Sequence, residues 1–193
     1  MSYVTSVTLY KFSELTKEVQ DNLTKIFEVP DYWDEPVIEG IIEEARSLGV
    51  ENFDFQYSGF GSQGDGCSFT GTLAQELAES IYKDRINRDG WKAGGNGGYD
   101  ITFRRKSYPH YVHEKMVYAQ LLPFDEDEYD YEYVDIIENA YNDWKDELCY
   151  EWYQRLGTHY DELIESENIK NHYEEMGAVF LEDGRILNIS YRE

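Results

Sequence analysis

The strongest periodic signal in the chain is the stretch DIIENAYNDWKDELCYEWYQRLG, residues 135–157. Large apolar side chains recur in it at spacings of four, three, four, four and four residues: Ile137, Tyr141, Trp144, Leu148, Trp152 and Leu156. Positions three and four apart share one face of an α-helix, so the spacing predicts a long amphipathic helix. Gly157 is expected to end this helix, and Thr158 is expected to cap a further helix that reaches Met176.

The rest of the chain mixes strand and helix patterns without a strict alternation. We expect strands over 2–12, 53–57, 67–70, 99–103 and 108–122, helices over 13–27, 37–48 and 72–87, and a terminal hairpin over 178–189. Ser13 is expected to cap the first helix and Gly49 to end the second. The hairpin turn is built on Asp183-Gly184.

This order of elements predicts an α+β fold with a mostly antiparallel sheet packed with helices, plus a long acidic C-terminal helical segment. A length of 193 residues fits a single domain over 1–193. Within it we expect a mixed α/β portion over 1–122, an acidic helical portion over 123–176 and a terminal hairpin over 177–193.

The chain is strongly acidic. Acidic residues outnumber basic ones 40 to 17, which gives a formal net charge of −23 and a pI near 4.4. Binding of nucleic acid through its phosphates needs a surface of Lys and Arg, so this composition argues against direct nucleic-acid binding. It also argues against binding to an anionic membrane surface. With two cysteines and no expected leader or membrane span, we predict a cytoplasmic protein.

The negative charge is concentrated in one segment. Residues 116–175 contain 18 acidic and 3 basic side chains, whereas 83–115 contain 8 basic and 4 acidic ones. Pairing between these two segments within the chain is one interpretation. A binding face for a basic protein is the other, because the solubility of a small domain needs a net charge of only about 2–8.

We expect the binding face to consist of carboxylates with interleaved tyrosines, since tyrosine is enriched in protein interfaces. Rows of carboxylates on a helix can present negative charge at a density like that of nucleic-acid phosphates. The candidate partner-binding residues are Asp125, Glu126, Asp127, Glu128, Asp130, Glu132, Asp135, Glu138, Asp143, Asp146, Glu147, Glu151, Tyr129, Tyr131 and Tyr133.

A glycine-rich stretch between two predicted strands is the second candidate site. It contains Ser62, Gln63, Gly64, Asp65 and Gly66. The stretch lacks the lysine of a phosphate-binding P-loop and the carboxylates of a calcium loop. We interpret it as a specialised turn in which Gln63 and Asp65 bond to backbone groups, with an anion-binding loop as the alternative.

The residues that suit catalysis are few. Cys67 could act as a nucleophile with His110 or His113 as base, but a small buried thiol is the favoured interpretation. His110 and His113 alone are a weak signal for zinc. Arg104, Arg105 and Lys106 could contact a phosphate ligand or pair with the acidic helix. We therefore predict no catalytic residue, metal or cofactor.

The glycine-rich stretch also carries a resemblance. Tyr57-Ser58-Gly59-Phe60, then 62–66 (SQGDG), then Ser68-Phe69 resemble a motif of uncharacterised bacteriophage proteins that are often labelled as antitoxins of toxin–antitoxin systems. The match covers about 15 residues and implies a phage origin and a small accessory role. Separately, the acidity is similar to that of DNA-mimic antirestriction proteins.

These observations lead to one expected function and two alternatives. The expected function is a phage-encoded, non-enzymatic inhibitor that binds a basic host defence or nucleic-acid-binding protein by DNA mimicry. The alternatives are an antitoxin-like partner that neutralises a basic toxin, and a small phosphate- or nucleotide-binding protein or enzyme that uses the glycine-rich turn. The oligomeric state stays open, with a dimer as one alternative.

Overall fold

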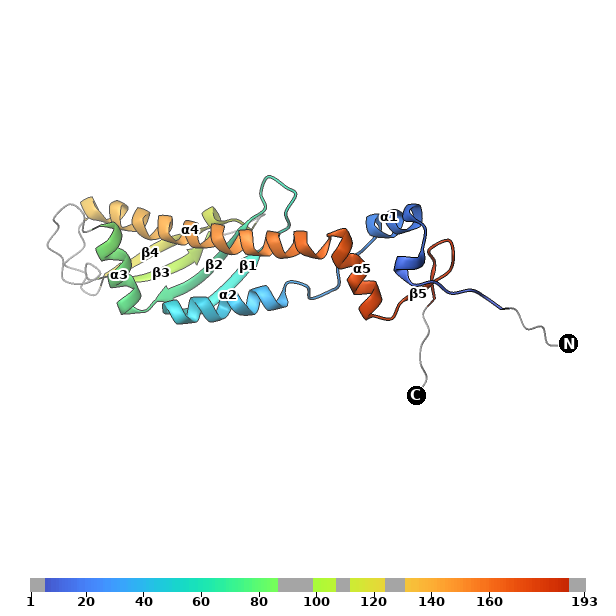
Figure 1. The fold of residues 1–193 in the computed structure, drawn as a ribbon. Coiled ribbons are helices and arrows are strands. Elements are labelled where there is room, and N and C mark those ends of the chain that lie inside the picture. The colour runs from blue at the N-terminus through green and yellow to red at the C-terminus, as the bar shows by residue number, and fades with distance from the viewer. Residues whose placement is uncertain (1–5, 87–98, 107–111, 124–130, 188–193) are drawn as a thin grey trace. The chain divides into compact units, whose positions relative to one another are not determined.

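The computed structural model describes residues 6–86, 99–106, 112–123 and 131–187, with backbone only at 99, 123 and 131–133 (Figure 1). These residues form two compact units. The larger lies within Asp34–Gly157 and is called the sheet unit. The smaller combines residues up to Trp33 with residues from Thr158 onward and is called the terminal unit.

The sheet unit is built on four antiparallel strands in the order β1-β2-β3-β4, so each strand pairs with its neighbour in the sequence. The strands are β1 (Val50–Tyr57), β2 (Cys67–Leu73), β3 (Tyr99–Arg105) and β4 (Val117–Pro123). The helices of this unit are α2 (Glu35–Leu48), α3 (Gln75–Arg85) and α4 (Tyr131–Leu163), with a 3₁₀ turn, η3, at Glu114–Met116. The predicted α+β class with an antiparallel sheet is confirmed.

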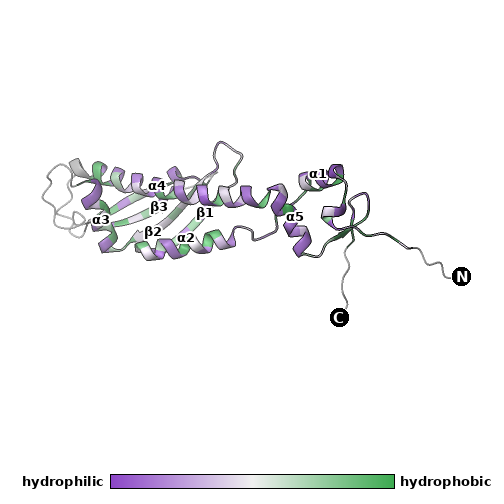
Figure 2. Ribbon diagram, viewed as in Figure 1, coloured by the Kyte–Doolittle hydropathy of each residue, from purple (hydrophilic) through white to green (hydrophobic). Residues whose placement is uncertain are grey.

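Alternate strand residues form the core beneath α4. Phe69 and Phe103 are fully buried, and their rings meet edge to face at 5.3 Å. Trp152 of α4 packs edge-on against Phe53, with ring centroids 5.6 Å apart, and Trp144 stacks on Phe103 at 6.1 Å. Figure 2 shows the corresponding apolar stripes on the strands and helices. Aromatic side chains from both the strands and α4 thus form this helix–sheet contact.

The buried face of α4 is rotated slightly from the predicted stripe. Its buried side chains are Val134, Ile137, Tyr141, Lys145, Cys149, Trp152 and Leu156. Trp144 and Leu148 from the predicted stripe lie at its margin and are half-buried. The buried stripe of a helix is about 100° wide or more. Lys145 and Cys149, which follow Trp144 and Leu148, lie nearer the centre of this stripe than the two predicted residues do. The consequence is a buried lysine that a count of apolar residues cannot detect.

The predicted end of this helix at Gly157 is wrong, because α4 continues to Leu163 and Thr158 lies inside it. A side chain at position 157 would meet the ring of Phe60 at 3.7 Å. This is an ordinary van der Waals distance, so packing against Phe60 does not require glycine here, and the helix tolerates it. The helical conformation is interrupted at Ile164–Glu165, after which α5 runs from Ser166 to Glu175.

Two further predictions in the sheet unit need correction. Thr72 and Leu73, predicted to begin a helix, end strand β2 instead, because Thr72 pairs with both Glu51 and Thr102. The strand predicted over 108–122 begins only at Val117, after η3; residues 107–111 lie outside the described part. The helix end at Gly49 is confirmed: this residue adopts a left-handed conformation with φ 97°.

The terminal unit contains η1 (Phe12–Glu14), α1 (Lys17–Lys25), α5 and a hairpin of β5 (Val179–Phe180) and β6 (Ile186–Leu187). Its core residues are Phe12, Leu15, Leu23, Ile169, Tyr173 and Phe180. The predicted hairpin is confirmed in its described part. The predicted strand over 2–12 is wrong for residues 6–12, which form only an isolated bridge from Tyr10 to Phe180. Thr16, not Ser13, caps α1 through a bond from Val19 N–H.

The boundaries predicted at 122/123 and 176/177 do not coincide with those of the two units. The reason is a pairing between distant parts of the chain: Tyr10 and Phe180 exchange two backbone hydrogen bonds of 2.9 Å. This pairing places an N-terminal segment with the C-terminal hairpin. That the chain folds as a single domain stays a prediction.

Candidate functional site on helix α4

The face of α4 opposite the core carries four of the candidate partner-binding residues that the structure describes: Asp135, Asp143, Glu147 and Glu151. The exposed residues from the start of this face to Gln154 are Asp135, Ile136, Asn139, Asp143, Glu147, Tyr150, Glu151 and Gln154. We call this set the α4 face. The predicted residues 125–130 lie outside the described part of the chain, as do the side chains of Tyr131, Glu132 and Tyr133.

Glu138, one of the predicted carboxylates, serves the sheet rather than the α4 face. Glu138 accepts a hydrogen bond from the backbone of Leu121, and Asn142 Oδ1 accepts one from Ala119 N–H at 2.8 Å. The two acceptor side chains are one helical turn apart on α4, and the N–H groups that they bind belong to alternate residues of edge strand β4. Burial, with the nearby charge of Asp135, raises the pKa of Glu138. This arrangement covers part of an otherwise unpaired strand edge.

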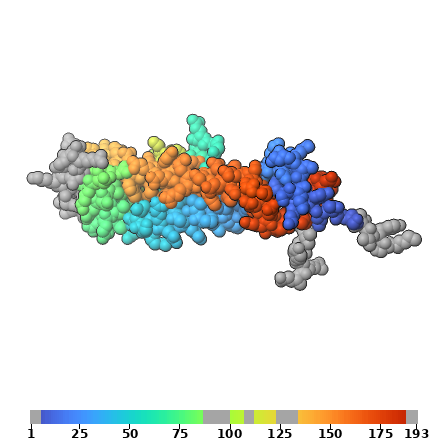
Figure 3. Space-filling view, viewed as in Figure 1, coloured from blue at the N-terminus to red at the C-terminus, as the bar shows by residue number. Residues whose placement is uncertain are grey.

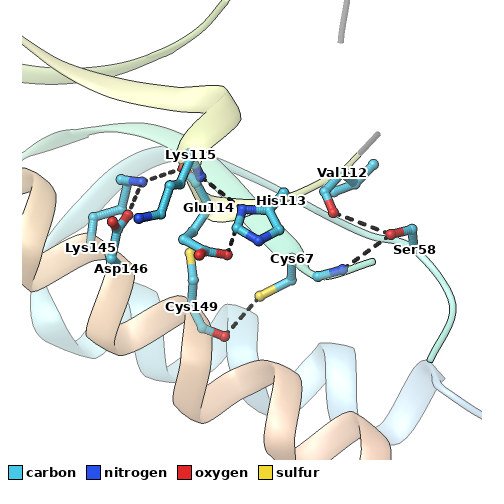
Figure 4. A network of polar contacts seen from close by, with 10 residues as sticks. Ser58, Cys67, Val112, His113, Glu114, Lys115, Lys145, Asp146 and Cys149 are labelled. Atoms are coloured by element: carbon cyan, nitrogen blue, oxygen red, sulfur yellow. Dashed lines mark hydrogen bonds and ion pairs between the residues drawn. The ribbon is translucent and has the colours of Figure 1, made fainter. Parts of the chain in front are cut away.

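The second internally used carboxylate is Asp146, which pairs with Lys145 (Figure 4). Lys145 is only 1% exposed, and its Nζ also donates to the backbone carbonyl of Glu114 in η3. A buried ammonium needs such partners because removing it from water is costly. Lys145 therefore ties α4 to the turn before β4, and its charge is not available at the surface.

Glu147 is exposed but forms an ion pair with Arg85 of α3, both guanidinium nitrogens facing the two carboxylate oxygens. These hydrogen bonds lower the pKa of Glu147 and raise that of Arg85. Arg85 belongs to the basic segment identified in the sequence. Pairing between the basic and acidic segments thus occurs at this point.

Three carboxylates remain on the α4 face: Asp135, Asp143 and Glu151. All are exposed, and none forms an ion pair within 4 Å among the described residues. They are spaced eight residues apart, which is about 12 Å along the helix axis and a rotation of about 80° around it, so they spread across the exposed side of α4. Tyr150 and Ile136, exposed by 66% and 54%, lie on the same face. The described part of α4 is therefore a mixed acidic and apolar surface, with sparser free charge than a row of phosphates.

The glycine-rich turn, residues 59–66, lies beside α4 and projects from the surface (Figure 3). Its Asp65 accepts hydrogen bonds from Gly61 N–H at 2.8 Å and Ser62 N–H at 2.6 Å. The bond from Ser62 is the main cause that lowers the pKa of Asp65. Tyr153 Oη of α4 donates to Gly59 carbonyl at 2.6 Å, which fixes the turn on the helix.

This arrangement confirms that Asp65 bonds to the turn's backbone. The side chain of Gln63 is exposed and makes no hydrogen bond to any described residue, so that part of the prediction is wrong. The two N–H groups that could receive an anion are occupied by the protein's own carboxylate. Nothing further in the described geometry of Ser62, Gly64 or Gly66 favours a ligand.

Cys67 is a buried thiol, as the favoured interpretation holds. Its Sγ donates to the carbonyl of Cys149 at 3.0 Å (Figure 4). Hydrogen bonding with Cys149, followed by burial, raises the pKa of the Cys67 thiol. A nucleophilic cysteine needs the opposite shift. His113 pairs instead with the carboxylate of Glu114 at 2.9 Å.

Among the described residues, Arg104, Arg105 and Lys106 form no ion pair with the acidic helix. Arg105 lies 3.8 Å from Asp54 of β1, while Arg104 and Lys106 are exposed. No group of three or more metal-ligating side chains occurs among the described residues. Nor does any helix in the described part have the length and apolar character needed to cross a membrane.

Comparison with protein families gives a match. The model of a family described as a domain of unknown function, DUF8835, matches residues 33–166. This span covers the sheet unit and the whole of α4. No curated protein and no solved structure matches the chain.

Proposed function

The chain belongs to the DUF8835 family, and we propose that it is a non-enzymatic inhibitor that binds the basic surface of a nucleic-acid-binding protein. In this proposal the α4 face occupies the surface that would otherwise receive nucleic acid. The partner is a host defence complex or another DNA-binding protein, and the site of action is the cytoplasm of the host cell.

The α4 face is the observation that carries this proposal. Asp135, Asp143 and Glu151 form no ion pair within 4 Å in the described part, although the chain contains 17 Lys and Arg; the charges of Arg85 and Arg155 act on Asp143 and Glu151 from a greater distance. A surplus of like charge destabilises the compact state, so its retention on one face favours a role in binding. Exposed Tyr150 and Ile136 add contact area of the kind that protein interfaces bury.

The residues that suit chemistry are used for structure, which supports a binding role over catalysis. Cys67 has a raised pKa and a carbonyl partner. Asp65 occupies the N–H groups of its own turn. The alternative of a phosphate-binding enzyme built on this turn therefore lacks a specific observation in its favour.

A competition experiment tests the proposal. A fluorescent DNA duplex is bound to each member of a panel of basic DNA-binding and defence proteins, and the full chain is added at increasing concentration. We expect displacement of the duplex from at least one member. When binding of the chain to that member is measured without the duplex, we expect weaker association as NaCl rises from about 50 to 200 mM, because exposed charge pairs are screened.

Two triple variants locate the contact. The variant Asp135→Asn, Asp143→Asn, Glu151→Gln removes three charges from the α4 face. The matched control, Glu39→Gln, Glu43→Gln, Glu76→Gln, removes three exposed carboxylates from α2 and α3 that also form no ion pair among the described residues. Only the first variant is expected to lose displacement.

Two outcomes would contradict the proposal. Binding that leaves the duplex in place would favour the antitoxin-like alternative, in which one basic toxin is neutralised at a surface unrelated to nucleic acid. Equal losses in the two triple variants would mean that net charge, and not the α4 face, determines binding.

A further inference from the structure

The terminal unit contains a groove that lies outside the α4 face. It has a volume of about 510 Å³ and runs between α1 and the β5–β6 hairpin. Its principal lining residues are Val19, Leu23, Ile26, Tyr173, Gly184 and Ile186. Most of these residues, and both elements that form its walls, fall outside residues 33–166 matched by the family model.

Gly184 sets how closely the hairpin approaches α1. It has φ 86°, a left-handed conformation that favours glycine. A Cβ at this position would lie 2.7 Å from Val19 Cγ1. The absence of a side chain therefore lets the hairpin turn pack directly on α1 as one wall of the groove.

The rim of the groove is apolar and faces solvent. Ile26, which directly follows α1, is 71% exposed, and Ile186 of β6 is 46% exposed. Val19, Leu23 and Ile26 follow one another at spacings of four and three residues, so the apolar face of α1 continues from the core to the rim. Such a strip fits the apolar side of a partner helix, which presents residues at the same spacings.

The charge around the groove is negative. Glu28 lines it and forms no ion pair among the described residues, whereas Asp183 is paired with Arg185 at 2.8 Å. Across residues 6–33 and 158–187 there are 13 acidic and 5 basic side chains. An apolar strip with an acidic surround complements an apolar strip with basic flanks.

From these observations we propose that the groove binds an amphipathic helix with lysine- or arginine-rich flanks, supplied by a partner protein. Its apolar residues contact Ile26 and Ile186, and a basic side chain pairs with Glu28. This second contact is independent of the α4 face, because a partner can bind either surface or both. An experiment can therefore refute one of the two proposals without refuting the other.

A designed helix tests the groove. The probe is a fluorescent 18-residue Leu/Lys peptide with leucines on one helical face, and the control peptides are a scrambled Leu/Lys sequence and a Leu/Glu helix. Binding to the full chain is measured by anisotropy. We expect the Leu/Lys helix to bind at least about tenfold more tightly than either control.

Matched variants separate the groove from general acidity. Ile26→Asp places a charge in the groove, whereas Met176→Asp makes the same change at a residue of the terminal unit that is 69% exposed and does not line the groove. Both sites are exposed, so both variants should fold, as far-UV circular dichroism can verify. We expect about a tenfold loss of affinity in the first and less than about twofold in the second.

The outcomes that would contradict helix binding in the groove are distinct from those that would contradict the inhibitor proposal. Equal effects of the two aspartate variants, or equal binding of the ordered and scrambled peptides, would show attraction by charge alone. Loss of peptide binding in the triple variant of the α4 face, with Ile26→Asp unaffected, would place the helix on α4. Retention in that triple variant together with loss in Ile26→Asp supports the groove.

Discussion

Replacing the buried lysine of α4 probes the most consequential contact that the sequence pattern does not indicate. Lys145→Ala removes three methylenes from a side chain that is 1% exposed, together with the hydrogen bonds to Asp146 and the Glu114 carbonyl. Lys145→Met removes the ammonium but keeps most of the aliphatic stem. Comparing the two variants separates the packing of the stem from the polar contacts.

The expected losses of stability follow from these contacts. Each buried methylene contributes about 0.8 kcal/mol, so the missing stem costs roughly 2.4 kcal/mol. The polar contacts of a charged group contribute about 1.5–3 kcal/mol, but the release of a buried ammonium offsets part of this. Asp146 stays 31% exposed and can be hydrated when its partner is removed. We expect losses of about 3 kcal/mol for Lys145→Ala and about 1 kcal/mol for Lys145→Met.

Urea unfolding measures these losses. Trp144 and Trp152, two of the four tryptophans, both contact the sheet core, so tryptophan fluorescence reports in part on this unit. With an m value of about 2 kcal/mol/M, the midpoint should fall by roughly 1.5 M for the alanine variant and 0.5 M for the methionine variant. Adding Asp146→Asn to Lys145→Met should have little further effect.

Equal midpoints for the two lysine variants would refute this account, because the aliphatic stem would then contribute nothing. A loss below about 1 kcal/mol in Lys145→Ala would likewise mean that the side chain is not packed between α4 and η3.

Three further predictions concern the turns and the sheet. Hydrogen bonds, the Ser62 N–H bond first among them, lower the pKa of Asp65. The stabilisation by its carboxylate is therefore present at neutral pH and is lost as pH falls below about 4 through the folded-state pKa. When unfolding is measured at decreasing pH, the difference in free energy of unfolding between wild type and Asp65→Asn should disappear in this range. Gly71→Ala places a methyl group 2.8 Å from Val50 Cγ1 and should lower the free energy of unfolding by about 1–3 kcal/mol, measured in urea. Gly184→Ala should cost about 1–3 kcal/mol in thermal unfolding, since this residue has φ 86° and packs on α1; no change in melting temperature would contradict the described hairpin.

Features with local causes could be predicted from the sequence. The end of α2 at Gly49, the alternation of Phe53 and Phe55 in β1 and the Asp183-Gly184 hairpin each depend on a few neighbouring residues. In these places local preference and the fold agree, so the pattern leads to the correct element.

Features that depend on distant contacts could not be predicted in this way. Glycine inside a helix costs only about 1 kcal/mol, so Gly157 does not force α4 to end, and the helix continues to Leu163. Thr72 resembles a helix start, yet pairing with β1 and β3 makes it a strand residue.

The candidate site shows the same division. The apolar periodicity of the sequence correctly predicts that carboxylates such as Asp143 lie on the exposed face of a helix. It could not separate them from Glu138, which serves β4, or from Glu147, whose partner Arg85 lies 62 residues away. The pattern therefore overestimated the free negative charge on α4, because it cannot identify internal partners.

The most direct test of the proposed function is the ratio of half-inhibitory concentrations of the two triple variants in the duplex-displacement assay. Loss of three exposed charge pairs, at about 0.5 kcal/mol each, predicts a ratio of about ten between the α4 variant, which lacks the charges of Asp135, Asp143 and Glu151, and its matched control. A ratio near one would contradict the claim that the α4 face binds the partner.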